Sequence, residues 1–424
     1  MQKHNWLNLC LDLMFNSFGF DITKIKDFNK LIEHALSVCG YSLVTLTEDT
    51  QKHKVCWIYA YAGFGYHEIS NYAESLKWNM EALKLIEALH DSKHTNAIKI
   101  INNIAETYNE TGKYELALEW HKKALEICKE VHGVSTPESA TLYNNIGSDY
   151  HYLGNYTEAL IWFNKALEIR EAILPFDDIA IAQSYNNIAG ICRLLGDIQK
   201  ALDFHNKALD IRMMACGSEH PLVAASLNNI AGIYVKGGLV DEAIELYTDA
   251  LNIYKKVYNE VENHPDIATA YNNLASALLR KGDAKKALEY YTITWTMRTL
   301  VLGAGHPDTL ASYNNIAQVY SKQGEHEKSL ELHQDILKMK LAHGGENPSV
   351  ATSYNNIGAC YYRLGNFDDA LIWFYKSWTI DRASFGDANY ETINVENNLQ
   401  LAFAEAKRSN PSKYSLSFEE WKRR

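Results

Sequence analysis

Histidine and cysteine side chains are numerous enough for catalysis or metal binding, but their spacing favours neither. The chain holds 16 histidines and seven cysteines, without an H-E-x-x-H motif or a C-x-x-C pair. It also lacks the G-x-S-x-G motif of serine hydrolases and the G-x-x-x-x-G-K-[ST] motif of phosphate loops. We therefore expect no enzyme, no metal and no cofactor. The cysteines are odd in number and scattered along the chain, which favours reduced thiols in a cytoplasmic protein.

A different chemistry is repeated along the whole chain, namely paired carboxamides. Each carboxamide offers two hydrogen-bond donors and one acceptor. The steps between successive Asn-Asn doublets are 42, 42, 42, 44, 42, 41 and 42 residues. The doublets lie at Asn102-Asn103, Asn144-Asn145, Asn186-Asn187, Asn228-Asn229, Asn272-Asn273, Asn314-Asn315, Asn355-Asn356 and Asn397-Asn398.

A period of this length is typical of a solenoid, in which repeated units bury their apolar faces against their neighbours. In one unit, Thr136-Pro137 has the composition of a helix start, and Gly154 lies where that helix must end. Apolar residues at Leu142, Ile146 and Tyr150 have the spacing of one buried helix face. A second amphipathic helix follows, so each unit is predicted to be an antiparallel helix pair.

The same punctuation recurs in the other units. Glycine stops are expected at Gly112, Gly154, Gly196, Gly238, Gly282, Gly324 and Gly365. Small residues recur where the two helices must approach closely, at Ala117, Ala159, Ala201, Ala243, Ala287, Ser329 and Ala370. Loops before several first helices carry His220-Pro221, His264-Pro265, His306-Pro307 and Asn347-Pro348, which we interpret as structural.

Blocks such as Tyr143-Asn144-Asn145-Ile146-Gly147, Leu153 to Leu160 and Lys165 to Arg170 resemble the tetratricopeptide repeat. The longer unit is similar to that of kinesin light chains and nephrocystin-like proteins, and the resemblance covers about residues 57–408. It implies an all-α fold, a right-handed superhelical solenoid of antiparallel helix pairs. It also implies that the first helix of each pair lines a concave groove that binds a protein or peptide partner.

The repeats divide the chain into four parts. Residues 1–56 are predicted to be an N-terminal helical cap or degenerate repeat, and residues 57–386 eight helix pairs. A C-terminal capping helix is expected over 387–410, because this helix lacks a following Ala-Leu pair. Residues 411–424 form a short amphipathic tail of unassigned role.

The second asparagine of each doublet is a candidate for peptide binding. It projects away from the apolar stripe, and stacking would place these side chains in a row along the groove. Such a row could hold the backbone of an extended peptide. The alternative is a structural role, in which the carboxamides tie neighbouring helices together; for the first asparagine we favour that role. The candidates are Asn103, Asn145, Asn187, Asn229, Asn273, Asn315 and Asn356.

A row of basic residues precedes the glycine stops in the later units, whereas Glu110 and Tyr152 occupy these places earlier. Such a row would attract a carboxylate-rich peptide or an exposed C-terminus. The alternative is that cations near helix C-termini only complement the helix dipole. The residues are Arg193, Lys236, Arg280, Lys322 and Arg363.

Charge and hydropathy exclude other partners. The formal net charge is −11 with both signs mixed along the helices, which argues against nucleic acid. No apolar stretch is long enough to cross a membrane, and the first residues do not have the pattern of a signal peptide.

The sequence therefore predicts a cytoplasmic scaffold that binds an extended peptide segment of a partner protein, and the basic row favours an acidic segment. One alternative is a sensor or regulatory array of a bacterial signalling or defence system that works with a separate effector or ATPase. A third alternative is a motor-cargo adaptor. It is weaker because kinesin light chains carry an N-terminal coiled coil, and residues 1–56 lack the heptads of one.

Overall fold

The computed structural model describes residues 32, 36–37, 49–89, 95–259 and 263–423. The described residues fold into α-helices joined by short loops, and none of them lies in a β-strand, so the predicted all-α fold is confirmed. The chain forms two compact units, residues 1–217 and 218–424. Most of the predicted N-terminal cap, residues 1–48, lies outside the described residues, and the predicted boundary at residue 57 falls inside the first described helix.

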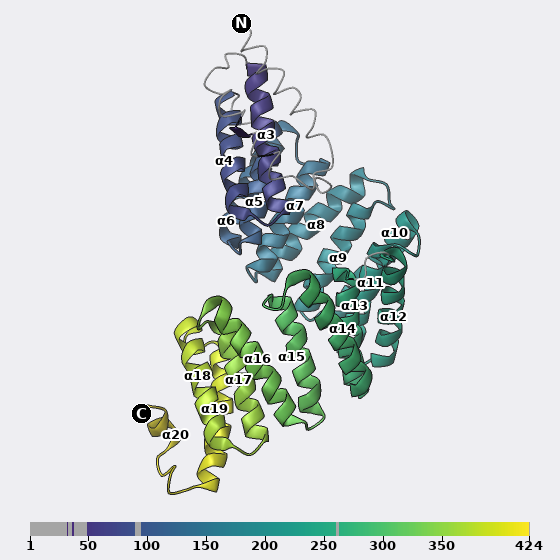
Figure 1. Ribbon diagram of the computed structural model, residues 1–424. Helices are drawn as coiled ribbons and strands as arrows, with labels where there is room; N and C mark the ends of the chain where they lie inside the picture. The colour runs from purple at the N-terminus through teal and green to yellow at the C-terminus, as the bar shows by residue number, and fades with distance from the viewer. Residues whose placement is uncertain (1–31, 33–35, 38–48, 90–94, 260–262, 424) are drawn as a thin grey trace. The chain divides into compact units, whose positions relative to one another are not determined.

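Within each unit the helices form consecutive antiparallel pairs, and each helix packs against the next (Figure 1). The first unit contains α3 (Asp49–Glu68), α4 (Tyr72–Leu89), α5 (Thr95–Glu110), α6 (Tyr114–Val131), α7 (Pro137–Tyr152), α8 (Tyr156–Ile173), α9 (Ile179–Leu194) and α10 (Ile198–Cys216). The second contains α11 (Pro221–Lys236), α12 (Val240–Val257), α13 (Pro265–Lys281), α14 (Ala284–Leu302), α15 (Pro307–Lys322), α16 (His326–Gly344), α17 (Pro348–Arg363), α18 (Phe367–Phe385), α19 (Tyr390–Ser409) and α20 (Phe418–Lys422).

Glycine follows the first helix in the seven pairs from α5–α6 to α17–α18, because the turn requires a left-handed backbone; after α3 the left-handed residue is Ser70. Gly282, for example, has φ of 98° and its N–H bonds to the carbonyl of Leu278. The seven glycines predicted as stops all have positive φ, a conformation that costs other residues about 1–2 kcal/mol. Each first helix therefore ends at a defined residue, which fixes where its last-turn side chains lie.

The helix starts are set by side-chain caps. Thr136 accepts a hydrogen bond from the N–H of Ser139 at the start of α7, as the Thr-Pro sequence predicts. Before α11, α13 and α15 the cap is a histidine that precedes proline, and its Nδ1 accepts a hydrogen bond from the N–H two residues later. His220, His264 and His306 make this bond at 3.2 Å, which confirms their structural role.

Small side chains allow the helices of a pair to pack closely. The seven alanine or serine residues predicted at this contact are all 0% exposed. Aromatic rings from the paired helix cover the same interface, as where Tyr143 of α7 packs against Trp162 of α8. Burial of these apolar faces between neighbouring pairs is the main stabilising contribution of such arrays.

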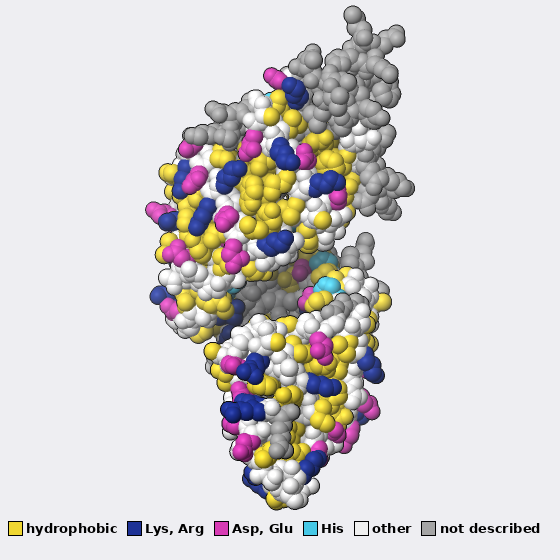
Figure 2. All heavy atoms as spheres, turned by 90° about the vertical axis from the view of Figure 1, so that its left-hand side faces the viewer, with side chains coloured by type: hydrophobic (Ala, Val, Ile, Leu, Met, Phe, Trp, Pro, Cys, Tyr) yellow, Lys and Arg dark blue, Asp and Glu magenta, His cyan; other side chains and the backbone are white. Residues whose placement is uncertain are grey.

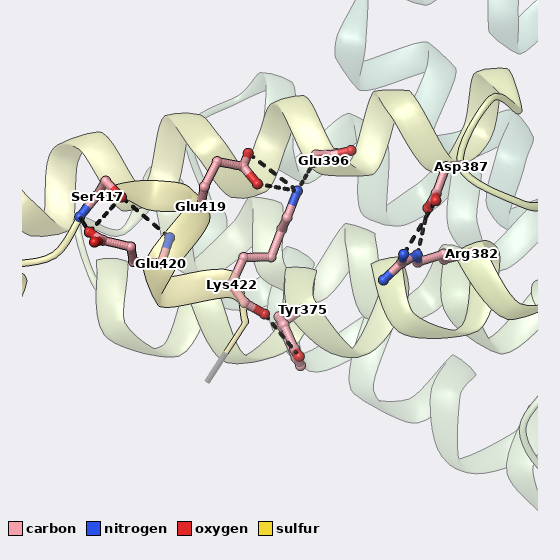
Figure 3. A network of polar contacts seen from close by, with 8 residues as sticks. All are labelled: Tyr375, Arg382, Asp387, Glu396, Ser417, Glu419, Glu420 and Lys422. Carbon is pink, nitrogen blue, oxygen red and sulfur yellow. Dashed lines mark hydrogen bonds and ion pairs between the residues drawn. The ribbon is translucent and has the colours of Figure 1, made fainter.

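The last helices of the second unit close its apolar core. Helix α19 takes the place of a first helix, but the tail turns back over it instead of forming a full-length partner. Trp421 packs against Phe403 of α19 and Tyr375 of α18. Lys422 is paired with Glu396 and Glu419, and its carbonyl accepts from the Tyr375 hydroxyl (Figure 3). Helix α19 lies within residues 387–410, and the tail covers its apolar side.

None of the described helices combines the length and the apolar composition that would be needed to cross a bilayer.

Candidate functional site

The second asparagine of many doublets bonds to the first asparagine of the preceding repeat. We call this hydrogen bond, from Nδ2 of the later residue to Oδ1 of the earlier one, a rung. Rungs of 2.9–3.0 Å join Asn145 to Asn102, Asn187 to Asn144, Asn315 to Asn272, and Asn398 to Asn355. At these four positions the Nδ2 groups tie first helices of neighbouring repeats together, which is the structural role. Peptide contact through the Oδ1 atoms of the same four residues stays a prediction.

Two rungs of the second unit are open. The Oδ1 atoms of Asn228 and Asn314 are buried without a hydrogen-bond partner. Their expected donors, Asn273 and Asn356, donate no side-chain hydrogen bond to any described residue; Asn273 only accepts a long 3.5 Å contact from Asn272. Unpaired buried acceptors of this kind cost roughly 1–3 kcal/mol each, so they are uncommon without a ligand or functional reason.

Loop length explains which rungs of the second unit are open. Loops 303–306 and 386–389 have four residues, and each precedes a closed rung. The α12–α13 loop, residues 258–264, is longer, and the α16–α17 loop, residues 345–347, is shorter. A slip of one residue in the register of neighbouring helices is a displacement of about 1.5 Å, enough to break a hydrogen bond. The two irregular steps of 44 and 41 residues are therefore the two open rungs.

A cavity of about 430 Å³ lies at the open rung between α15 and α17, with α16 behind it. Four residues predicted as a site come together here: Asn315 and Lys322 on α15, and Asn356 and Arg363 on α17. The remaining lining side chains are Asn314, Gln318, Ser321, Ser329, His333, Ala359 and Cys360.

The back of this cavity is polar and uncharged. His333 is 7% exposed, and its Nδ1 is buried without a partner. Burial, and secondarily the charge of Lys340, lowers the pKa of His333 to about 4, so the ring is neutral near pH 7. Ser329 is fully buried, with its Oγ 3.5 Å from Sγ of Cys360. Sequence reasoning missed His333 because it occupies a repeat-core position, at which α6 and α10 also carry a histidine, His121 and His205.

The predicted basic row lies at the ends of the first helices. Lys236, Arg280, Lys322 and Arg363 are exposed in the last turns of α11, α13, α15 and α17. None of the four forms an ion pair with a described residue, whereas neighbouring lysines such as Lys281 do. The last-turn position also agrees with the dipole alternative. On the face drawn in Figure 2, Lys, Arg, Asp and Glu side chains are interspersed.

The first unit lacks this combination. Arg193 is half-buried near the end of α9. Burial, and secondarily the charge of Arg193, lowers the pKa of His151 and that of His205, the latter to about 4. Asn103 lines a mainly apolar cavity of about 490 Å³, beside Trp57 and Tyr61 of α3. Asn229, on α11 of the second unit, is exposed and lies outside the α15–α17 cavity.

Comparison with known proteins identifies the type of repeat. A family model described as tetratricopeptide repeat matches residues 55–130, 96–172, 180–256 and 266–342, and a second model of the same description matches residues 350–389. No match was found among curated proteins.

Two solved structures are similar to about half of the chain. BtubC (BKLC) from P. vanneervenii is 22% identical, over 55% of this chain and 92% of that chain, with a TM-score of 0.48. The nearly identical TPR-like repeats of a putative kinesin light chain from Podosopora anserina are 23% identical, over 49% and 97%, with a TM-score of 0.42. The family models, the helix pairs and the glycine stops lead to one conclusion: the chain belongs to the tetratricopeptide repeat family.

Proposed function

We propose that the chain is a protein-interaction scaffold that binds an extended, acidic segment of a partner on the first helices of its second unit. Tetratricopeptide repeats generally mediate contacts between proteins, and the two helices of each pair supply no catalytic constellation among the described residues. The observation that carries the proposal is the cavity between α15 and α17. It brings Asn315, Asn356, Lys322 and Arg363 to one surface.

The unpaired cations support an acidic ligand. Four consecutive first helices each end in a cation that forms no ion pair with described residues, in a chain of net charge −11. Charge-assisted hydrogen bonds to carboxylates are about twice as strong as neutral ones. A segment with carboxylates spaced along its length would contact several of these helices, whereas a compact charged molecule would contact one or two.

The second unit is favoured over the first by a direct contrast. Two rungs of the first unit are closed, at Asn145 and Asn187, and Glu110 and Tyr152 replace the cations at the ends of α5 and α7. The five described cysteines are free thiols, which supports the proposal of a reducing compartment such as the cytoplasm.

The test uses fluorescein-labelled twelve-residue peptides of alternating glycine and glutamate, with glycine–lysine peptides as the control ligand. We expect the glutamate peptide to bind with an affinity that falls as salt rises, and Lys322→Glu with Arg363→Glu to weaken it at least tenfold. The matched control variant carries Lys285→Glu and Lys338→Glu, exposed lysines on the second helices α14 and α16. Equal losses in both double variants would contradict a localised site.

The signalling-array and cargo-adaptor alternatives involve the same surface and differ in the partner. Affinity capture of the intact chain followed by mass spectrometry distinguishes them. The charge-reversed variant serves as the background, because a partner bound through the proposed surface is depleted there.

A further inference from the structure

The cavity between α15 and α17 is deeper than a row of first helices requires. Ser329 and His333 at its back belong to α16, the second helix of the pair, and are 0% and 7% exposed. A peptide backbone resting on the first helices would not need these groups. The depth indicates room for a side chain that enters between α15 and α17.

Three hydrogen-bonding groups inside the cavity have no partner among the described residues. Asn314 presents a buried acceptor, its Oδ1 atom, and His333 presents a buried Nδ1. Asn356 presents side-chain N–H donors. In a closed rung, such as that of Asn315 and Asn272, the donor and the acceptor satisfy each other at 2.9 Å. In the open rung neither group has a partner among the described residues, and the two residues belong to α15 and α17, the helices that flank the cavity.

The distribution of charge separates the rim from the back. Lys322 and Arg363 are exposed at the rim, whereas the back contains neutral amide, hydroxyl and imidazole groups. A carboxylate moved to the back would lose its hydration without gaining a countercharge, which costs far more than moving a neutral polar group. Carboxylates should therefore stay at the rim, and the entering group should be neutral with both a donor and an acceptor.

We propose that this cavity binds a glutamine or asparagine side chain of the partner segment, flanked by acidic residues. The ligand carboxamide replaces the missing rung: its N–H donates to Oδ1 of Asn314, and its oxygen accepts from Nδ2 of Asn356. The neighbouring carboxylates pair with Lys322 and Arg363. This inference rests on the proposed function and names the residue type that the site selects.

The other open rung is less suited to the same ligand. Its acceptor is Oδ1 of Asn228, but the position on α12 that corresponds to His333 is Tyr247, a larger buried ring. Selection for a carboxamide is therefore assigned to the α15–α17 cavity alone.

The experiment compares four twelve-residue glycine–glutamate peptides with glutamine, alanine, leucine or glutamate at one central position. Fluorescence anisotropy is measured with the full chain. We expect the glutamine peptide to bind about tenfold more tightly than the alanine peptide, because it satisfies buried groups that are otherwise unpaired. Asn314→Leu should abolish this preference and leave the affinity for the alanine peptide unchanged.

The matched control is Asn272→Leu, which removes an acceptor that Asn315 already occupies. This variant loses a rung but should keep the preference for glutamine, and a thermal melt confirms that both variants fold. Equal binding of all four peptides, or tightest binding of the central glutamate, overturns the carboxamide inference and leaves the scaffold proposal standing. Failure of every acidic peptide to bind overturns the proposed function, and the inference with it.

Discussion

The link between loop length and the open rung can be tested by inserting one residue. Adding a glycine after Gly345 lengthens the α16–α17 loop to the four residues found in 303–306 and 386–389, which precede closed rungs. We expect α17 to shift by about 1.5 Å along its axis, bringing Nδ2 of Asn356 to Oδ1 of Asn314. The open rung should then close.

The magnitude follows from the group that becomes paired. A hydrogen bond to a buried, unpaired acceptor recovers roughly 1–3 kcal/mol, whereas one extra loop residue costs only a few tenths of a kcal/mol in loop entropy. The net stabilisation should be about 1–2 kcal/mol. For a unit of this size, each kcal/mol raises the unfolding midpoint by about 2–4 °C, so a rise of about 2–8 °C is expected.

Circular dichroism melts and peptide binding provide the assay. The insertion after Gly345 should raise the midpoint and remove the preference for the glutamine peptide, because the rung now occupies Asn314 and Asn356. Its matched control, a glycine inserted after Gly303, should open the rung between Asn315 and Asn272 and lower the midpoint. A midpoint that falls in both variants, or that changes in neither, would refute the account of loop length.

Three further predictions concern stability. Gly282→Ala should lower the free energy of unfolding in urea by about 1–2 kcal/mol, because φ of 98° strains the backbone of any other residue. Gly190→Ala should raise it by about 0.5–1 kcal/mol, because Gly190 lies in a helix and the added Cβ meets no atom within 4 Å. The reverse order of the two variants would contradict this reasoning. His306→Ala should cost about 0.5–2 kcal/mol by removing the α15 cap, and His306→Asn should restore it, measured by the same method. The pKa of His333 is lowered to about 4 in the folded state, below its unfolded value, so the native state binds fewer protons than the unfolded state at mildly acidic pH. The contribution of neutral His333 to the free energy of unfolding is therefore complete above about pH 6.5 and should fall by about 2 kcal/mol at pH 5. Parallel urea titrations at pH 7 and 5 would detect this loss, and His333→Gln would remove it.

The repeat architecture was predictable because its determinants are local. A left-handed turn requires glycine, so Gly154 and Gly282 mark the ends of helices without knowledge of the fold. A close helix contact requires a small side chain, so Ala159 and Ala287 mark the packing interface. The eight predicted helix pairs and the final helix correspond to α3–α18 and α19 among the described residues.

The site was predictable only in part because it depends on the axial register of neighbouring repeats. The sequence placed Asn356 in a row of asparagines along the groove and Lys322 and Arg363 in a separate basic row, and all three line the cavity. Whether Asn356 reaches Asn314 depends on a shift of about one residue, which the steps of 44 and 41 residues signalled but did not resolve. The contribution of His333 depends on a gap between two first helices that no single repeat encodes.

The cap made by the tail has a consequence for protein engineering. Because Trp421 covers Phe403 and Lys422 is held by Glu396, the apolar surface that a further hairpin would need is already occupied. A module grafted directly after Ser409 would compete with residues 411–423 for that surface. Longer versions of this protein should instead be made by duplicating an internal pair, such as α13 with α14, and leaving residues 411–423 in contact with α19.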